Sequence, residues 1–148
     1  MDLRTMITRY CQYQERCQKE IRNKLYENGA DKEEVGQIMT ELIEQKLVDE
    51  ERFARAFARG KFRIKNWGRR KIVYELKQDQ ISDYCIRKGL DEIDEEEYLE
   101  TLRRITDKKM ADIRKDSNVF TRRAKLQRYL TQKGYENDLI AQMLREFI

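Results

Sequence analysis

The amino-acid sequence predicts an all-α protein made of three tandem three-helix repeats, nine helices in all. The 148 residues contain no proline and only six glycines, most of which stand where a helical pattern ends. Apolar residues recur three or four positions apart, and one pattern returns twice along the chain. Each unit of three short helices has a small core and depends on packing against its neighbours for stability. We therefore expect an elongated, curved array.

The first repeat is predicted over residues 1–46. Its first helix is expected near residues 3–11 and its second near residues 16–27, where Asn28 and Gly29 end it. The third helix opens with a D-x-x-E capping box at Asp31. One stripe of this helix carries the apolar residues Val35, Ile38, Met39, Leu42 and Ile43.

The second repeat is predicted over residues 47–92. Asp49 is the expected N-cap of a fourth helix that reaches about Lys65 and packs through Phe53, Phe57 and Ile64. A fifth helix is expected over residues 69–78, and a short sixth helix runs from Ser82 to Gly89.

The third repeat is predicted over residues 93–148. Its long seventh helix starts after Asp94 and reaches about Lys115, because a run of acidic residues stabilises a helix N-terminus. Thr121 is the expected cap of the eighth helix, which ends at Gly134. The ninth helix starts at Asn137 and carries the apolar residues Leu139, Ile140, Met143, Leu144 and Phe147.

The repeat itself is predicted from an alignment of the chain with itself. Shifts of 51 and then 54 positions superimpose apolar residues and a turn that carries Gly29, Gln80 or Gly134. The three aligned sets are Ile21, Leu25, Ala30 and Val35; Ile72, Leu76, Ile81 and Ile86; and Leu126, Leu130, Tyr135 and Ile140. Apolar spacing alone recurs in any helical protein, but here the turn, the cap and the apolar pair shift together.

Composition argues against an enzyme. The chain has no histidine, so it lacks the usual general base near neutral pH and the nitrogen ligands of most catalytic zinc sites. The acidic residues that follow Asp94 are adjacent in sequence and point in different directions on a helix. We therefore expect no catalytic residues, no metal and no cofactor.

The sequence also predicts a cytoplasmic protein. Its three cysteines are odd in number and lack C-x-x-C spacing, which favours reduced thiols over a disulfide or a metal site. No apolar run is long enough to span a membrane, and the first residues do not form a secretory signal. We expect a monomer without membrane contact.

Charge is distributed in blocks. Residues 52–71 hold nine basic and no acidic residues, whereas residues 91–102 hold seven acidic and no basic ones. Four arginines, Arg52, Arg55, Arg59 and Arg63, fall within about 80° on one side of the fourth helix, and we call them the arginine row. A solvated face would also explain them, but no acid within the block can relieve their repulsion, which favours anion binding.

The candidate binding residues lie in two basic segments, residues 52–71 and residues 103–128. The primary set is Arg52, Arg55, Arg59, Lys61, Arg63, Lys65, Arg69, Arg70 and Lys71, and the secondary set is Arg122, Arg123, Lys125 and Arg128. Trp67 stands among the primary set, where it either stacks on an unpaired base or packs at a helix start.

Four segments resemble the RecX family of regulatory proteins. They are KEIRNKLYENGADKEEVGQIMTEL (Lys19 to Leu42), LVDEERFARAFARGK (Leu47 to Lys61), WGRRKIVYEL (Trp67 to Leu76) and KLQRYLTQKGYENDLIAQML (Lys125 to Leu144). The resemblance implies three tandem three-helix repeats and a bacterial cytoplasmic protein that binds the recombinase RecA. It implies inhibition of the ATPase, strand-exchange and co-protease activities of RecA during DNA recombination, repair and the SOS response. Gln80 departs from the family, which commonly has glycine at this turn.

Two other functions fit the same charges. A sequence-independent DNA-binding helical module explains the basic blocks without RecA, and its affinity falls steeply with salt. A helical scaffold for a different acidic protein is the second alternative.

Overall fold

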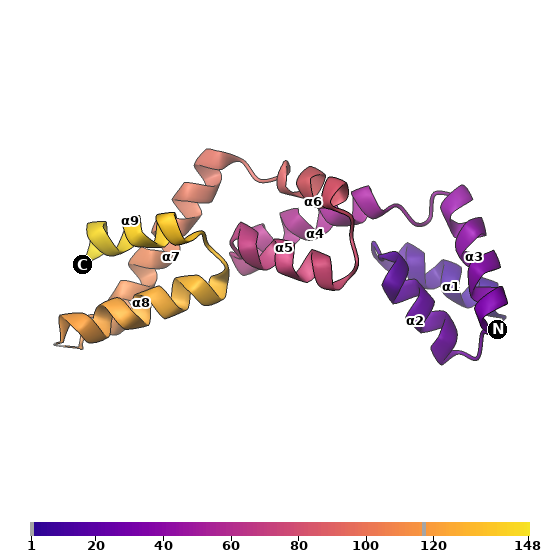
Figure 1. The fold of residues 1–148 in the computed structure, drawn as a ribbon, viewed down its shortest axis with the longest axis horizontal. Helices are drawn as coiled ribbons and strands as arrows, with labels where there is room; N and C mark the ends of the chain where they lie inside the picture. Colours follow the sequence, from indigo (N-terminus) through magenta and orange to yellow (C-terminus); the bar gives the residue numbers. More distant parts are fainter. Residues whose placement is uncertain (1, 117) are drawn as a thin grey trace.

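The structure is a computed structural model that describes residues 2–116 and 118–148, and in these residues it contains nine α-helices and no strand. The helices are α1 (Leu3–Tyr13), α2 (Gln18–Glu27), α3 (Lys32–Glu44), α4 (Glu50–Lys65), α5 (Arg69–Gln78), α6 (Asp83–Leu90), α7 (Glu95–Ile113), α8 (Val119–Lys133) and α9 (Asn137–Phe147). They form three consecutive groups of three in an elongated row, with the N-terminus and the C-terminus at opposite ends (Figure 1). The predicted all-α tandem repeat is confirmed.

The self-alignment of the sequence holds in three dimensions. Gly29, Gln80 and Gly134 all adopt positive φ angles, of 90°, 62° and 95°. After each of them, a backbone N–H reaches back to the carbonyl of the fifth residue before it, in the helix-ending geometry that a left-handed residue allows. All twelve aligned apolar residues are buried, namely Ile21, Leu25, Ala30, Val35, Ile72, Leu76, Ile81, Ile86, Leu126, Leu130, Tyr135 and Ile140.

Most predicted helix starts are confirmed by side-chain caps. Asp31, Asp49, Ser82 and Asp94 each accept a hydrogen bond from a backbone N–H of the first turn. The predicted cap of α8 is wrong, because Asn118 rather than Thr121 occupies this position. The side chain of Asn118 accepts from the backbone N–H groups of Phe120 and Thr121, so the helix starts earlier than Thr121.

The predicted packing face of α4 is partly wrong. Phe53 is buried and Phe57 half-buried, but Ile64 is 78% exposed. The buried face is instead centred on Ala54 and Ala58, because α4 packs closely on α6. A Cβ atom at Gly89 would lie only 2.7 Å from the carbonyl oxygen of Ala54, so small residues on both helices set this approach. Ile43 of α3 is likewise 46% exposed, at the edge of its predicted stripe.

The buried residues form two separate cores. One core lies among the first three helices and includes Ile7, Ile38 and Leu42, and Val48, which follows α3, also belongs to it. The other core runs without interruption through the second and third repeats. Cys17 belongs to this second core although it precedes α2. One side chain of the first repeat is therefore buried in the core of the second and third repeats.

Elsewhere the first and second repeats meet through polar contacts. The Lys19 ammonium donates to the Gln78 carbonyl (2.7 Å), and the backbone N–H of Gln18 donates to Glu50 (3.3 Å). Burial raises the pKa of Glu50, although the hydrogen bond from Gln18 opposes this effect. This junction therefore depends on hydrogen bonds around a single buried thiol.

The second and third repeats join through helix ends. The backbone N–H groups of Gly68 and Arg70, at the start of α5, donate to the carbonyls of Lys133 and Gly134 at the end of α8 (2.7 and 2.9 Å). The two helices thus satisfy each other's unpaired backbone groups. Contact this close requires glycine, because a Cβ atom at Gly68 would lie 2.3 Å from the Gly134 carbonyl oxygen.

Candidate functional site

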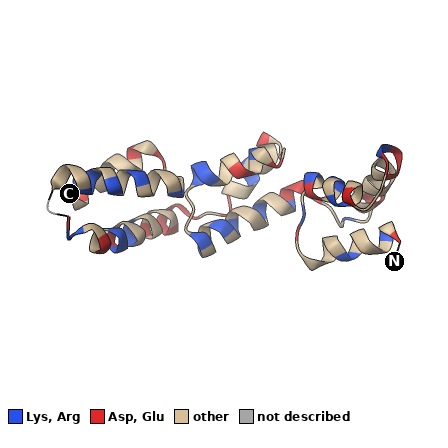
Figure 2. Cartoon of the chain, turned by 90° about the horizontal axis from the view of Figure 1, so that it is seen from below, with Lys and Arg blue, Asp and Glu red and all other residues tan. Residues whose placement is uncertain are grey.

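The arginine row is paired with acidic residues that lie outside the basic block of residues 52–71, one of them, Glu51, in the same helix. Figure 2 shows basic and acidic residues interspersed along the repeats. The ion pairs are Arg52–Glu15, Arg55–Glu51, Arg55–Glu92 (3.6 Å), Arg59–Glu92 (3.3 Å) and Arg63–Glu97 (3.9 Å). The expectation that the repulsion within the row has no local relief is therefore wrong, although every pairing acid lies outside the block.

The acidic block of residues 91–102 supplies two of these partners. It follows α6, which packs along α4, so Glu92 reaches Arg55 and Arg59 from a neighbouring element. The pairs with Glu92 and Glu97 are not evident from the sequence, because the two members of each pair stand more than 30 residues apart. Half-exposed ion pairs of this kind contribute little to stability, so these arginines can exchange their partners for an anion.

Arg69 is the most enclosed arginine among the primary candidates. Its guanidinium pairs with Glu95 and Glu136 and lies 3.9 Å from the centre of the Tyr98 ring. Burial lowers the pKa of Arg69, but the hydrogen bond to Glu136 and the negative charge of Glu136 together raise it by more. The net shift of the Arg69 pKa is therefore upward. Its backbone N–H also donates to the Tyr98 hydroxyl (2.9 Å), which in turn donates to Glu136. Arg69 thus connects the second and third repeats.

Four lysines near this junction lack ion pairs within residues 2–116 and 118–148. They are Lys61, Lys65, Lys71 and Lys133, and we call them the junction lysines. The ammonium groups of Lys61 and Lys71 lie 5.0 and 4.6 Å from the centre of the Trp67 ring. The Lys133 ammonium donates to the backbone carbonyl of Lys65 (3.1 Å), so lysines of two repeats converge.

Three of the junction lysines, Lys65, Lys71 and Lys133, repel one another. Burial lowers the pKa of Lys133, and the charges of Lys71 and Lys65 lower it further. A bound phosphate or carboxylate would relieve this repulsion, since no acidic side chain within residues 2–116 and 118–148 forms an ion pair with these lysines. We therefore regard the junction lysines as the stronger candidate for an anion site, ahead of the arginine row.

Trp67 packs as part of the protein. It is half-buried against the core, and its ring meets Phe57 edge-on with centroids 6.1 Å apart. The two lysine ammonium groups over it gain cation–π attraction. The ring therefore orders the lysines; stacking of Trp67 on a base stays a prediction.

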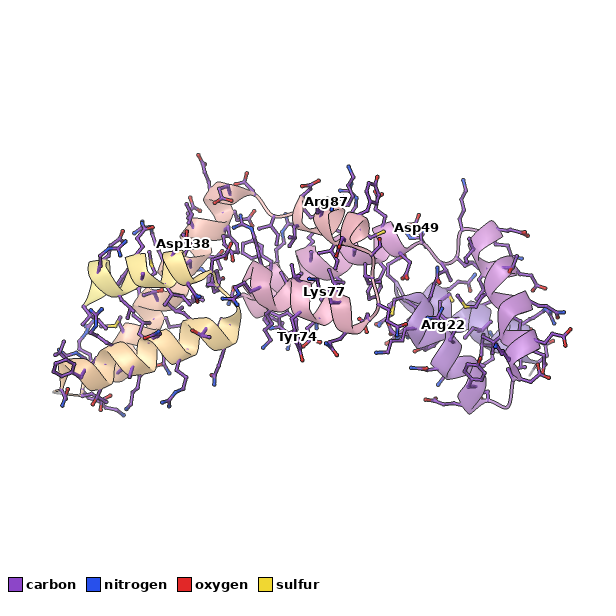
Figure 3. All side chains as sticks on the ribbon, viewed as in Figure 1. Arg22, Asp49, Tyr74, Lys77, Arg87 and Asp138 are labelled. Atoms are coloured by element: carbon purple, nitrogen blue, oxygen red, sulfur yellow. The ribbon has the colours of Figure 1, made fainter. Side chains whose placement is uncertain are left out.

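A groove lies beside the junction lysines. It has a volume of about 360 Å³ between α5 and α8, and Arg70, Lys71, Tyr74 and the acidic Glu75 line one side of it. Tyr74 is exposed at the lower edge of α5 in Figure 3. The Arg70 guanidinium donates to the Asn137 side chain (3.3 Å), a weak contact that leaves its charge uncompensated.

The secondary candidates divide into two pairs. Arg122 donates to the Asp116 carbonyl (2.5 Å) and Lys125 pairs with the Asp116 carboxylate (2.8 Å), so both order the start of α8. Arg123 and Arg128 are exposed. None of the four joins the junction lysines.

Lys133 is the residue that sequence reasoning missed. It lies in a segment of nearly neutral charge, and only the repeat alignment contains a signal for it. That alignment places Gly134 in a turn, but it does not show that this turn packs on Gly68 and brings Lys133 to Lys65.

Other kinds of site find little support in the described parts of the chain. No three cysteine, aspartate or glutamate side chains there are grouped to hold a metal ion. Cys11, Cys17 and Cys85 are free thiols. No helix in residues 2–116 and 118–148 has the length and apolar character to cross a membrane.

Two family models match the chain. Residues 49–90 match the RecX second three-helix domain, and residues 95–144 match the RecX third three-helix domain. The regulatory protein RecX of Prosthecochloris aestuarii (strain DSM 271 / SK 413) is 32% identical over 139 residues, which cover 94% of this chain and 89% of that protein. RecX of Clostridium botulinum (strain Alaska E43 / Type E3) is 32% identical over 130 residues. This chain spans about 60% of the length of that relative.

Solved structures show the same fold. The crystal structure of RecX from Lactobacillus salivarius matches with a TM-score of 0.82 at 22% identity, covering 97% of this chain and 92% of that one. Another crystal structure of regulatory protein RecX matches with a TM-score of 0.86 at 25% identity, covering 97% and 71%.

Proposed function

This chain belongs to the RecX family of regulatory proteins, and we propose that it binds the filament of the recombinase RecA on DNA and inhibits it. The affected activities are the ATPase, strand exchange and co-protease functions of RecA in recombination, repair and the SOS response. Family membership supports a regulatory role. The partner, the inhibition and a cytoplasmic, monomeric, non-enzymatic protein are parts of the proposal.

The junction lysines are the observation on which the proposal depends most. They include Lys65, Lys71 and Lys133, three positive charges without ion pairs in the described residues, which lie together at the contact between two repeats that share one core. Such a site suits the phosphates of filament-bound DNA or the carboxylates of an acidic protein surface. Of the primary candidates, Lys61, Lys65 and Lys71 belong to it, and Arg70 lies beside it.

The elongated shape supports the proposed mechanism. A RecA filament on DNA is a helix with a deep groove, and a narrow row of three repeats can lie along such a groove. In this position the chain contacts neighbouring subunits and DNA phosphates together. It obstructs an incoming duplex and hinders the movements of the filament between nucleotide states.

The test measures RecA ATPase on single-stranded DNA, titrated with this chain at substoichiometric ratios. The wild type is expected to lower the rate. Lys65→Gln with Lys71→Gln should raise the apparent dissociation constant about 5- to 30-fold, because each lost ion pair is worth about 0.5–1 kcal/mol. Lys32→Gln with Lys108→Gln removes the same charge at exposed positions away from the junction and is the matched control. An unchanged ATPase rate at equimolar wild-type protein would refute the proposal.

The alternative is a sequence-independent DNA-binding module. Binding to bare single-stranded DNA and to RecA-coated DNA, each over a salt series, separates the two functions. Equal affinity for both, falling steeply with salt as counterions are released, would favour the alternative. A pull-down that recovers an acidic protein but no recombinase would favour the scaffold.

A further inference from the structure

One side of α4 forms an apolar groove that the described residues leave uncovered. Its volume is about 190 Å³, and it is lined by Ala56, Phe57, Gly60, Lys61, Ile64 and Lys65. Ile64 is 78% exposed, the most exposed aliphatic side chain among the large apolar residues at the described surface. The groove lies on a different side of the helix from the arginine row.

Gly60 forms the floor of this groove. No heavy atom lies within 4 Å of where its Cβ atom would stand. Packing within the chain explains Gly68 and Gly89, where a Cβ atom would collide with backbone, but it does not explain Gly60. Glycine weakens a helix interior relative to alanine, and it also lets another chain approach the backbone closely.

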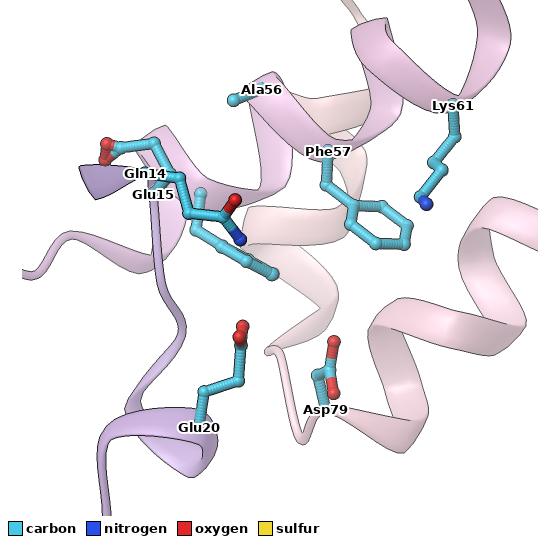
Figure 4. A pocket seen from close by; sticks show the side chains of 8 residues that line it. Gln14, Glu15, Glu20, Ala56, Phe57, Lys61 and Asp79 are labelled. Carbon is cyan, nitrogen blue, oxygen red and sulfur yellow. The ribbon is translucent and has the colours of Figure 1, made fainter. Parts of the chain in front are cut away.

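Charge restricts what can fill the groove. Lys61 and Lys65 flank it, and neither has an ion pair in the described part of the chain. The other end of the groove opens into a cleft of about 450 Å³ between the first two repeats, where Glu20 and Asp79 face Phe57 and Lys61 (Figure 4). Acidic groups of an occupant therefore belong at the Lys65 end.

We propose that this groove docks a segment of the recombinase surface in which an apolar side chain is flanked by acidic residues. The apolar side chain lies over Gly60 between Phe57 and Ile64, and the acidic residues pair with Lys65, at the end away from Glu20 and Asp79. This inference rests on the proposed function, because it names a contact by which the chain holds its protein partner. It assigns the protein contact to the apolar groove, at whose edge two of the junction lysines, Lys61 and Lys65, also lie.

Two other occupants fit less well. A second copy of this chain would bring a second set of unpaired lysines against Lys61 and Lys65, and like charges oppose such a contact. A nucleic-acid backbone would pair with the lysines but would leave Ile64 against phosphates and sugars, which offer it no apolar surface to bury.

The experiment measures binding of labelled protein to RecA filaments on single-stranded DNA. Gly60→Leu fills the groove at a position open enough to accept the side chain, and it should raise the dissociation constant at least tenfold. The matched control is Gly36→Leu, because Gly36 is also an open glycine inside a helix but stands near exposed polar residues such as Glu33 and Thr40. Ile64→Ala is expected to weaken binding about threefold, with Ile43→Ala as its control. Circular dichroism and thermal unfolding of every variant should match the wild type or show greater stability.

Each outcome decides between the two levels of the proposal. If the wild type does not bind the filament, the proposed function and this inference both fail. If the wild type binds and Gly60→Leu binds equally well, the inference fails and the function stands. Equal losses for Gly60→Leu and Gly36→Leu, or an equal loss of binding to bare DNA, would also overturn it. A selective loss with Gly60→Leu and Ile64→Ala supports it.

Discussion

Replacement of Gly68 by alanine is expected to break the junction between the second and third repeats. The φ angle of Gly68 is −79°, which any residue adopts, so the backbone itself tolerates alanine. The new Cβ atom, however, would lie 2.3 Å from the Gly134 carbonyl oxygen and 2.6 Å from the Tyr135 nitrogen. Both atoms belong to backbone, so the two helix ends must move apart.

The size of the effect follows from what this movement disrupts. Two backbone hydrogen bonds cross the junction, from Gly68 to Lys133 and from Arg70 to Gly134, and each contributes about 0.5–1.5 kcal/mol net. Overpacking adds about 1–3 kcal/mol. Gly68→Ala should therefore lower the free energy of unfolding by about 2–6 kcal/mol.

Urea unfolding followed by tryptophan fluorescence measures this change at the right place. Trp67 is the single tryptophan of the chain and directly precedes Gly68, so it reports on the core of the second and third repeats. Gly36→Ala is the control, because its Cβ atom meets nothing and should stabilise α3 by about 0.5–1 kcal/mol. An unfolding midpoint for Gly68→Ala equal to that of the wild type would refute the close contact between the helix ends.

Three further changes test other parts of the fold. Gln80→Gly should raise the free energy of unfolding by about 1 kcal/mol in thermal melts, because Gln80 adopts a left-handed conformation that glycine adopts without strain; a lower melting temperature would contradict this. Asn118→Ala should cost about 0.5–2 kcal/mol, whereas Thr121→Ala should cost less, and the reverse order would restore Thr121 as the cap of α8. Burial raises the pKa of Cys17 to about 12. Between about pH 9 and 12 the thiol therefore loses its proton in the unfolded state but keeps it in the folded state, so the free energy of unfolding falls as pH rises. Titration of the unfolding free energy over this range should show a shallower fall for Cys17→Ala, and identical slopes would mean that the thiol does not titrate differently on folding.

The fold could be predicted in detail because its signals are local. Capping residues such as Asp49 and Asp94 act within one turn of the helix that they start, and Gly134 acts within one turn of the helix that it ends. The repeat then placed the buried residues, since equivalent positions of a repeat have equivalent neighbours. The predicted burial of Ile64 was wrong, because a helical stripe does not specify which of its edges the neighbouring helix covers. Here α6 covers the side of α4 that carries Ala54 and Ala58.

The candidate site was less predictable because the arginines of the basic block pair with acidic residues that are distant in the sequence. The basic block contains no acid in sequence, yet Glu92 and Glu97 reach its arginines through the packing of α6 and the start of α7. Lys133 reaches Lys65 only because two glycines allow two helix ends to meet. Composition therefore located the region, and tertiary contacts selected the residues within it.

This compensation has a consequence for binding. An anion that binds at Arg59 must first displace Glu92, so part of its attraction is spent on breaking an existing pair. An anion at Lys71 displaces no carboxylate and also relieves repulsion with Lys133. Charge removal at Lys71 should therefore weaken binding more than removal at Arg59, although both residues carry one positive charge. We therefore expect the acidic block to compete with anionic partners for the arginine row, which leaves the junction lysines as the site that such partners prefer.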